Sequence, residues 1–279
     1  MTEASLELRE VRGPSALGGG WRRALELLYL LAATEFKRKY FDTALGYVWS
    51  LARPLVTFAV LLLVFTQVFR LGSQVPHYPV LLLFNIVLFS FFQEATDMAV
   101  NSITSQEAVV RKTQFPRLVI PLSVVLTSAF NLGPNLLVVF VFMLAFGVDP
   151  MWTWLLFPVL LVLLSVLTTA VAMIVSSLYP RFRDLGIIWS VLVTVLFYAT
   201  PVLYPLDKVD TGLANVLALS PLTPLFELAR KWMIDPTAPG PIETTGGATV
   251  AIAAALYVAI CIFAAWIFRR EAPRIAEEL

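Results

Sequence analysis

The 279-residue sequence is poor in the residues from which most catalytic and metal sites are built. It has one cysteine, Cys261, one histidine, His77, and only 14% charged residues. One thiol excludes an internal disulfide, and one thiol with one imidazole cannot form a His/Cys metal site. Cys261 lies in a late apolar run, where we expect a small buried hydrophobe. His77 lies in a proline-flanked loop, and the sequence offers no orienting partner to make it a general base.

Nucleotide-binding motifs are also missing. The thirteen glycines include no Gly-Lys pair, so the phosphate-cradling loop of ATPases is absent. The net charge of +1 gives no indication of a nucleic-acid partner. Soluble domains contain roughly 25% charged residues, whereas this chain is 59% hydrophobic. We therefore predict an all-α integral membrane protein with no nucleotide site of its own.

Six apolar runs have about the length that crosses a bilayer, some 20 residues. The predicted spans are residues 48–69, 78–98, 118–146, 152–178, 185–204 and 249–268. The third contains Gly133-Pro134 between Asn131 and Asn135, where we expect a kink or tilt. None of the six has an Asp, Glu, Lys or Arg at its centre. Ion-coupled transporters keep ionisable groups at membrane depth, so this pattern disfavours a secondary transporter.

The segment before the first span divides into a tail and a helix. Residues 1–20 are polar and glycine-rich, without the apolar region of a signal peptide, and predict a flexible tail. Residues 21–47 predict an amphipathic helix that lies in the membrane interface, with a basic end. Its apolar positions recur at steps of three or four: Trp21, Leu25, Leu28, Ala32, Phe36 and Tyr40. A positive-inside anchor and a docking element for a cytoplasmic partner both fit this helix.

The stretch 41–55, FDTALGYVWSLARPL, joins this helix to the first span. Tyr47 and Trp49 prefer the headgroup level, because each ring has one polar and one apolar end. Pro54 is expected in the first turn of the span, where its missing N–H costs nothing. The stretch therefore predicts a bend from the membrane surface into the membrane.

The distribution of Lys and Arg predicts the orientation of the chain. Sixteen of the twenty lie in the N-terminal segment, the loops after the second and fourth spans, and the tail 269–279. The other four, on the opposite side, are Arg70, Lys208, Arg230 and Lys231. Cytoplasmic segments carry the excess of positive charge, so both termini are predicted to be cytoplasmic.

Residues 213–234 are nearly long enough to form a seventh span. Pro221 and Pro224 divide the segment, however, and Glu227, Arg230 and Lys231 make its second half polar. A span here would also place the C-terminal arginines outside. We predict an external re-entrant hairpin of two short helices, followed by a loop over residues 235–248.

Two alternative roles are open for the carboxylates near the second span, and two for the aromatic residues of the first and fifth spans. Glu94 and Asp97 lie one helical turn apart near the inner end of the second span, where they reach headgroup water or contact a partner loop or a basic neighbour. Aromatic residues are abundant at 13%. Those of the first and fifth spans either face lipid or form a stacking path for sugar rings. The candidates for a path are Phe58, Phe65, Phe69, Trp189, Phe197, Tyr198 and Tyr204.

The order of the motifs resembles a known family. After the amphipathic helix come LGYVWSLARPL (45–55), NSITSQEAVVRKTQFPRLVIPLS (101–123), LYPRFRDLG (178–186), ATPVLYP (199–205) and the proline-split hairpin. This order is similar to that of the permease subunit of type-2 ABC exporters for lipid-linked polysaccharide, such as O-antigen of lipopolysaccharide, capsule-type polymer or wall teichoic acid. The resemblance covers about residues 21–268.

The resemblance implies a homodimer of six-span subunits in a bacterial cytoplasmic (inner) membrane, with two ABC ATPase subunits that hold ATP and Mg²⁺. The polymer is carried on an undecaprenyl pyrophosphate anchor, and the chain itself is not an enzyme. The loop 101–115 corresponds to a coupling helix that docks into the ATPase, with contacts expected from Ser105, Gln106, Glu107, Arg111 and Lys112. The hairpin 213–234 corresponds to an external gate, with Pro221, Pro224 and Arg230 as its candidate residues.

An anionic lipid head needs cations at the inner interface. Arg38, Lys39 and Arg53 lie where the surface helix meets the first span, and an arginine binds phosphate oxygens in a bidentate manner. A type-2 ABC permease for a small drug or lipid shares the expected fold and coupling and remains the alternative. A membrane-embedded enzyme is disfavoured, because the sequence shows no paired His/carboxylate or Ser/His set.

Overall fold

The computed structural model describes residues 20–40, 46–68, 70, 75–106 and 118–271. These residues form helices and turns and no strand, which confirms the all-α class. The longer helices are α1 (Gly20–Tyr40), α2 (Val48–Leu63), α3 (Tyr78–Val100), α6 (Val119–Ala145), α7 (Phe157–Leu178), α8 (Leu185–Ala199), α10 (Thr223–Met233) and α12 (Gly247–Glu271). The short ones are α4 (Ser102–Ser105), α9 (Thr211–Leu217), α11 (Pro241–Thr245), a π-helical turn (Val64–Val68) that extends α2, and 3-10 turns at Trp152–Leu156 and Leu206–Lys208.

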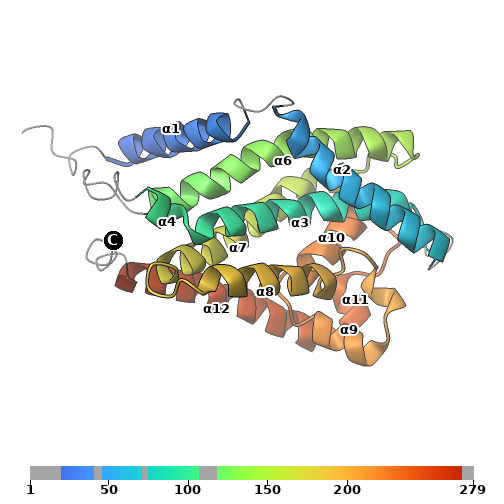
Figure 1. Cartoon of the computed structure of the whole chain (residues 1–279). Coiled ribbons are helices and arrows are strands. Elements are labelled where there is room, and N and C mark those ends of the chain that lie inside the picture. The colour runs from blue at the N-terminus through green and yellow to red at the C-terminus, as the bar shows by residue number, and fades with distance from the viewer. Residues whose placement is uncertain (1–19, 41–45, 69, 71–74, 107–117, 272–279) are drawn as a thin grey trace, which may run out of the picture.

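Helix α3 is the centre of the bundle. It packs against α2, α6, α7 and α8, which surround it in Figure 1. Every residue from 80 to 89 is buried, and this stretch is apolar on all sides except at Asn85, as expected of a helix enclosed by others. The core therefore lies between the predicted second span and its neighbours within one chain.

Five described helices are long and apolar enough to cross a membrane. They are Val48–Val68, Tyr78–Val100, Val119–Ala145, Trp152–Leu178 and Gly247–Glu271. Each corresponds to one of the predicted spans. Helix α6 passes through Pro134 as one continuous element.

Helix α8 covers only part of the predicted fifth span. It ends at Ala199, short of the predicted end at Tyr204. The reason is Pro201, which pushes the residue before it out of the helical region: Thr200 is extended, with φ −85° and ψ 146°. Fifteen residues of helix extend about 22 Å, less than the roughly 30 Å of a hydrocarbon core.

The segment after α8 is buried and bonded to α3. Val202 and Leu203 are 0% and 3% exposed. Tyr78 Oη donates to the Leu203 carbonyl at 2.8 Å, and Asn85 Nδ2 donates to the Pro201 carbonyl at 3.0 Å. These bonds satisfy backbone carbonyls that would otherwise be buried without a partner.

Helix α1 packs along the first half of α6, and the two run side by side in Figure 1. Ala32, on the predicted apolar stripe, is fully buried, and its carbonyl accepts from Thr127 Oγ1. Phe36 meets Phe130 edge to face, with centroids 6.0 Å apart. The helix ends at Tyr40, before the predicted boundary at residue 47. Its location in a membrane interface stays a prediction.

Two short helices, α9 and α10, occupy the proline-split segment. They lie at the opposite end of the molecule from α4 (Figure 1). Pro224 is in the first turn of α10, a position that needs no N–H. Trp154 Nε1 donates to the Met233 carbonyl at 3.0 Å, and Thr153 Oγ1 donates to the Trp232 carbonyl. The last turn of α10 is thereby fixed to the 3-10 turn Trp152–Leu156 that precedes α7.

Candidate functional site

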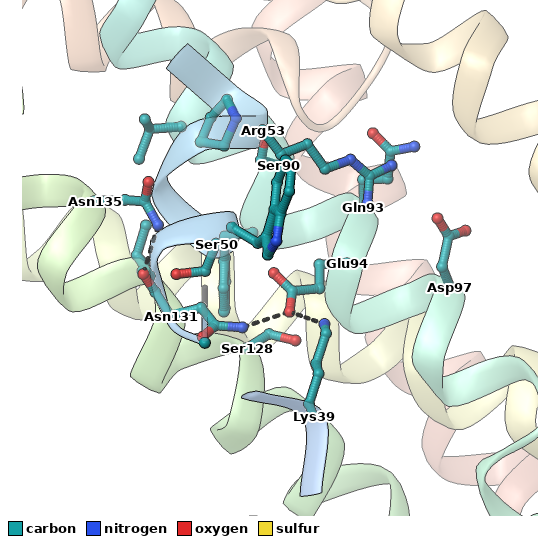
Figure 2. A pocket seen from close by; sticks show the side chains of 16 residues that line it. Lys39, Ser50, Arg53, Ser90, Gln93, Glu94, Asp97, Ser128, Asn131 and Asn135 are labelled. Carbon is teal, nitrogen blue, oxygen red and sulfur yellow. Dashed lines mark hydrogen bonds and ion pairs between the residues drawn. The ribbon is translucent and has the colours of Figure 1, made fainter. Parts of the chain in front are cut away.

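A cavity of about 360 Å³ lies where the end of α1 and the start of α2 meet α3 and α6 (Figure 2). We refer to it as the joint cavity. Its volume is in the range of small-molecule sites. Its lining residues are Lys39, Gly46, Trp49, Ser50, Arg53, Pro54, Val87, Ser90, Phe91, Gln93, Glu94, Asp97, Ser128, Asn131, Leu132 and Asn135.

The joint itself is shaped by the residues 46–54. Gly46 has φ +48°, a left-handed conformation that glycine adopts readily. Helix α2 begins at Val48, so Pro54 lies inside the helix and not in its first turn as expected. Trp49, Ser50 and Arg53 therefore lie in the first two turns of α2, and all three line the joint cavity.

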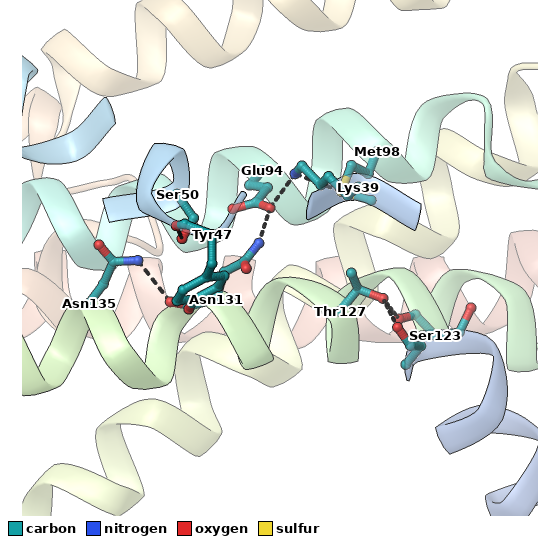
Figure 3. Close-up of polar contacts among 10 residues, drawn as sticks. Lys39, Tyr47, Ser50, Glu94, Met98, Ser123, Thr127, Asn131 and Asn135 are labelled. Carbon is teal, nitrogen blue, oxygen red and sulfur yellow. Dashed lines mark hydrogen bonds and ion pairs between the residues drawn. The ribbon is translucent and has the colours of Figure 1, made fainter. Parts of the chain in front are cut away.

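One carboxylate oxygen connects three helices at the cavity (Figure 3). Glu94 Oε1 on α3 accepts from Lys39 Nζ at 2.5 Å and from Asn131 Nδ2 on α6 at 2.5 Å. Of the two alternatives for Glu94, the structure therefore shows the contact with a basic neighbour. The side chains of Lys39 and Glu94 are 37% and 24% exposed, so solvent and solutes reach the pair.

The other two predicted cations differ in their surroundings. Arg53 lines the joint cavity, extends toward Gln93 in Figure 2, and forms no ion pair among the described residues. Arg38 pairs with Glu35 at 2.7 Å on the exposed side of α1 and is not a lining residue. The structure thus brings together two of the three predicted head-group cations, Lys39 and Arg53.

Side-chain amides and hydroxyls complete the wall of the cavity on α6. Asn135 Nδ2 donates to the Asn131 carbonyl at 2.8 Å. Ser128 is fully buried, and its Oγ has no hydrogen-bond partner among the described residues. Tyr47 lies beside this wall, and burial raises the pKa of its phenol, which stays neutral at physiological pH.

The aromatic residues of the predicted path differ in their burial, and two of the seven are buried within this chain. Phe58 is 8% exposed and packs edge to face on Phe142, and Trp189 is 9% exposed against Phe92. Tyr198 is 57% exposed. The remaining members are partly buried, except Phe69, which lies outside the described residues: Phe65, Phe197 and Tyr204. The aromatic path stays a prediction.

Most of the predicted coupling segment also lies outside the described residues, including Glu107, Arg111 and Lys112. Its first part forms α4, which ends at Ser105, and Gln106 follows as its C-cap. In Figure 1, α4 lies at the end of the bundle where the chain enters α6 and leaves α12.

The predicted gate contains a buried charged cluster. Arg230 Nη1 contacts Asp207 Oδ1 at 2.5 Å, and the Arg230 side chain is only 6% exposed. Glu227, 2% exposed, accepts from the Leu206 N–H at 3.2 Å. Burial raises the pKa of the Glu227 carboxyl to about 7. Pro221 lies in the turn between the two helices.

Sequence reasoning missed part of the joint cavity. Asn131 and Asn135 drew attention only as neighbours of a proline, and Gln93 and Ser128 were not singled out. A usable signal is present, since two amides four residues apart share one face of an apolar helix. Polar side chains in such helices face protein and not lipid.

Comparison with known proteins completes the description. The family model "ABC-2 type transporter" matches residues 26–234. Over 202 residues the chain is 33% identical to "O-antigen export system permease protein RfbA" of Myxococcus xanthus, covering 72% of this chain and 77% of that protein. Two proteins of the same description from Klebsiella pneumoniae are 29% and 28% identical over the same lengths. All the residues that line the joint cavity lie within the matched region.

Proposed function

Because the chain belongs to the ABC-2 type transporter family, we propose that it is the permease subunit of an ABC exporter for O-antigen or a similar lipid-linked polysaccharide. The observation that carries this proposal is the relationship to three O-antigen export system permeases, at 28–33% identity over 72% of the chain. The polymer is proposed to cross a bacterial cytoplasmic membrane on its lipid carrier.

The energy is proposed to come from a separate ABC ATPase that binds ATP and Mg²⁺. The absence of a Gly-Lys phosphate loop from the sequence supports a partner in this role. By the resemblance described above, two copies of the chain assemble with two ATPase subunits. The end of the bundle that holds α4, together with the loop 101–115, is the proposed docking site for the ATPase.

Helix α8 with residues 200–205 is proposed as an additional crossing, the fifth in chain order, which brings the total to six. A 15-residue helix is short for this purpose, but the buried segment that follows has carbonyls bonded to Tyr78 and Asn85. Non-helical backbone at membrane depth is tolerated where protein satisfies its polar groups. With this crossing both termini lie in the cytoplasm, and α9 and α10 form the external gate.

This topology is tested by single cysteines in a Cys261→Ala background. Thr211, at the start of α9, and Phe182, in the loop before α8, are both exposed. An impermeant thiol reagent added to intact cells should label Thr211→Cys, and Phe182→Cys only after the cells are opened. Labelling of Phe182→Cys from outside contradicts the proposed orientation.

Deletion of the gene tests the function. Polymer should then be synthesised but stay inside the cell, and export should return only when the chain is supplied together with an active ATPase partner. The matched control supplies the chain with a partner that cannot hydrolyse ATP. Normal surface polymer after deletion, with changed resistance to a drug or changed lipid distribution, supports the small-molecule alternative and overturns the proposal.

A further inference from the structure

We propose that the joint cavity binds the glycosyl phosphate at which the carrier lipid is joined to the first sugar of the polymer, and that it recognises that sugar as well as the phosphate. This inference rests on the proposed function and adds to it a specificity for the sugar. It is carried by three observations: the donor and acceptor chemistry of the cavity, the unsatisfied hydroxyl of Ser128, and the surface that continues from the cavity.

The wall of the joint cavity carries side chains of both charges together with neutral polar groups. Two cations face the joint cavity, but so do two carboxylates, three side-chain amides and three serine hydroxyls. A site for phosphate alone gains nothing from carboxylates, which repel it. Sugar hydroxyls both donate and accept, so they pair with carboxylates and with amides alike. A ligand that joins a phosphate to a sugar uses every group in this wall.

The cations are placed at one side of the cavity, on the α1–α2 joint. Lys39 is held by Glu94, whereas Arg53 forms no ion pair within 4 Å among the described residues and attracts Asp97 only at longer range. Arg53 therefore presents its guanidinium to an incoming phosphate, which it binds through two parallel hydrogen bonds. The phosphate also competes with the Glu94 carboxylate for Lys39, because the Lys39–Glu94 ion pair is partly exposed.

The sugar-facing groups lie on α3 and α6. Gln93 and Asn135 come from the two helices on opposite sides of the Glu94–Asn131 bond (Figure 2). Ser128 also lines the cavity, on the other side of Asn131 from Asn135, and its Oγ is buried and without a partner among the described residues. A buried hydroxyl without a partner costs stability, and a sugar hydroxyl in the cavity satisfies it.

The outer face of α2 explains why the ligand is carried on a lipid. Trp49, Arg53, Val56, Val60 and Leu63 follow at steps of four and three, so they share one face of the helix. The last three are apolar and 59–63% exposed. The face thus begins at the joint cavity with an indole and a cation and continues as exposed hydrocarbon. A phosphate at Arg53 places the attached lipid tail on this apolar stripe.

The test uses the purified permease–ATPase complex and two water-soluble probes, farnesyl diphosphate and farnesyl diphosphate that carries one N-acetylglucosamine. Calorimetry should give about tenfold tighter binding of the sugar-bearing probe, which corresponds to one or two added hydrogen bonds. Gln93→Ala and Asn135→Ala should each reduce this preference to about threefold or less, because each weakens the sugar-bearing probe more than farnesyl diphosphate. Arg53→Ala should weaken both probes by about tenfold or more.

Gln67→Ala is the matched control, because Gln67 is an exposed amide on the same helix as Arg53 but outside the cavity. It should change neither affinity. Equal binding of the two probes to the wild-type complex, or equal loss of both in the amide variants, overturns the sugar site. If the same complex still exports polymer in cells, the proposed function stands and only this inference fails. If it exports none, the proposed function fails.

Discussion

Lys39 Nζ lies 2.5 Å from Glu94 Oε1, although the two residues are 55 positions apart in the sequence. The same oxygen accepts from Asn131, so one carboxylate joins the end of α1 to α3 and α6. The Glu94 carboxylate is thus already bound to Lys39 inside the joint cavity, where an anionic ligand is proposed to bind. An anionic ligand must compete with it for Lys39, and its binding is expected to loosen the attachment of α1 to the bundle.

Replacement of Glu94 tests this competition. Glu94→Gln removes the resident negative charge, so the affinity for farnesyl diphosphate should rise by about two- to fivefold, as expected for a partly exposed pair. The free energy of unfolding should fall by less than about 1 kcal/mol. Glu35→Gln, which removes the partner of Arg38 outside the cavity, should leave the affinity unchanged. Unchanged or weaker binding by Glu94→Gln contradicts the competition.

The bond between Tyr78 and Leu203 holds the segment after α8 in the bundle. Tyr78→Phe deletes the hydroxyl and leaves a buried carbonyl without this donor, which should lower the free energy of unfolding by about 1–3 kcal/mol. Thermal unfolding of the purified protein measures the loss. Tyr29→Phe is the control, since Tyr29 is 63% exposed. Equal unfolding temperatures of the two variants would show that this bond does not fix the segment.

Glu227 should make the stability of the hairpin depend on pH. Its pKa is raised from 4.5 to about 7 by burial, so between these values the folded state binds a proton that the unfolded state has lost. Stability should therefore fall as pH rises from about 4.5 to about 7 and then level off. The fall is at most about 3–4 kcal/mol, since one pKa unit corresponds to about 1.4 kcal/mol.

Glu227→Gln cannot ionise and should abolish this fall when unfolding is measured at several pH values. Glu243→Gln, a change at an exposed carboxylate in α11, should keep it. The pKa of Glu243 is lowered, chiefly by a hydrogen bond from the Gly240 N–H, so it acts at lower pH and with the opposite sign. A stability that rises between pH 5 and 7 in the wild type, and equally in Glu227→Gln, would refute the assignment.

The coupling loop is tested by charge reversal. Arg111→Glu with Lys112→Glu should abolish export while the complex still hydrolyses ATP, because the loop no longer docks correctly into the partner. Arg269→Glu with Arg270→Glu changes the same number of charges in the last turn of α12 and should leave export at the wild-type rate. Wild-type export by the loop variant, with the ATPase bound, contradicts the docking role.

The helical class and five of the spans are readable from the sequence, because an apolar run of about 20 residues has few other uses. The end of α8 was readable too, since Thr200 precedes a proline. The extent to which the other helices bury each span could not be read from the sequence. Helices α3 and α12 are both apolar, yet 78% of the span window of α3 is buried and only 17% of that of α12. This difference depends on which helices pack around each span, and the composition of a span does not reveal its neighbours.

The candidate site was predictable only in part. Lys39 and Arg53 were identified because cations beside a membrane span suit an anionic head group. Their placement opposite Glu94, Gln93 and Asn135 depends on how α2, α3 and α6 pack, which single-helix patterns do not contain. For the same reason the burial of Phe58 and Trp189 could not be anticipated, since an aromatic side chain in a span suits lipid, core and path equally.

Transport by purified components tests the central claim most directly. The permease and its ATPase are reconstituted in liposomes with the ATPase outside, and radiolabelled lipid-linked polysaccharide is added to the outer leaflet. The account predicts that ATP makes the polymer resistant to an impermeant glycosidase, and that a partner unable to hydrolyse ATP gives no protection. ATP hydrolysis that leaves the polymer fully digestible, while a fluorescent lipid or drug is moved, would contradict the account.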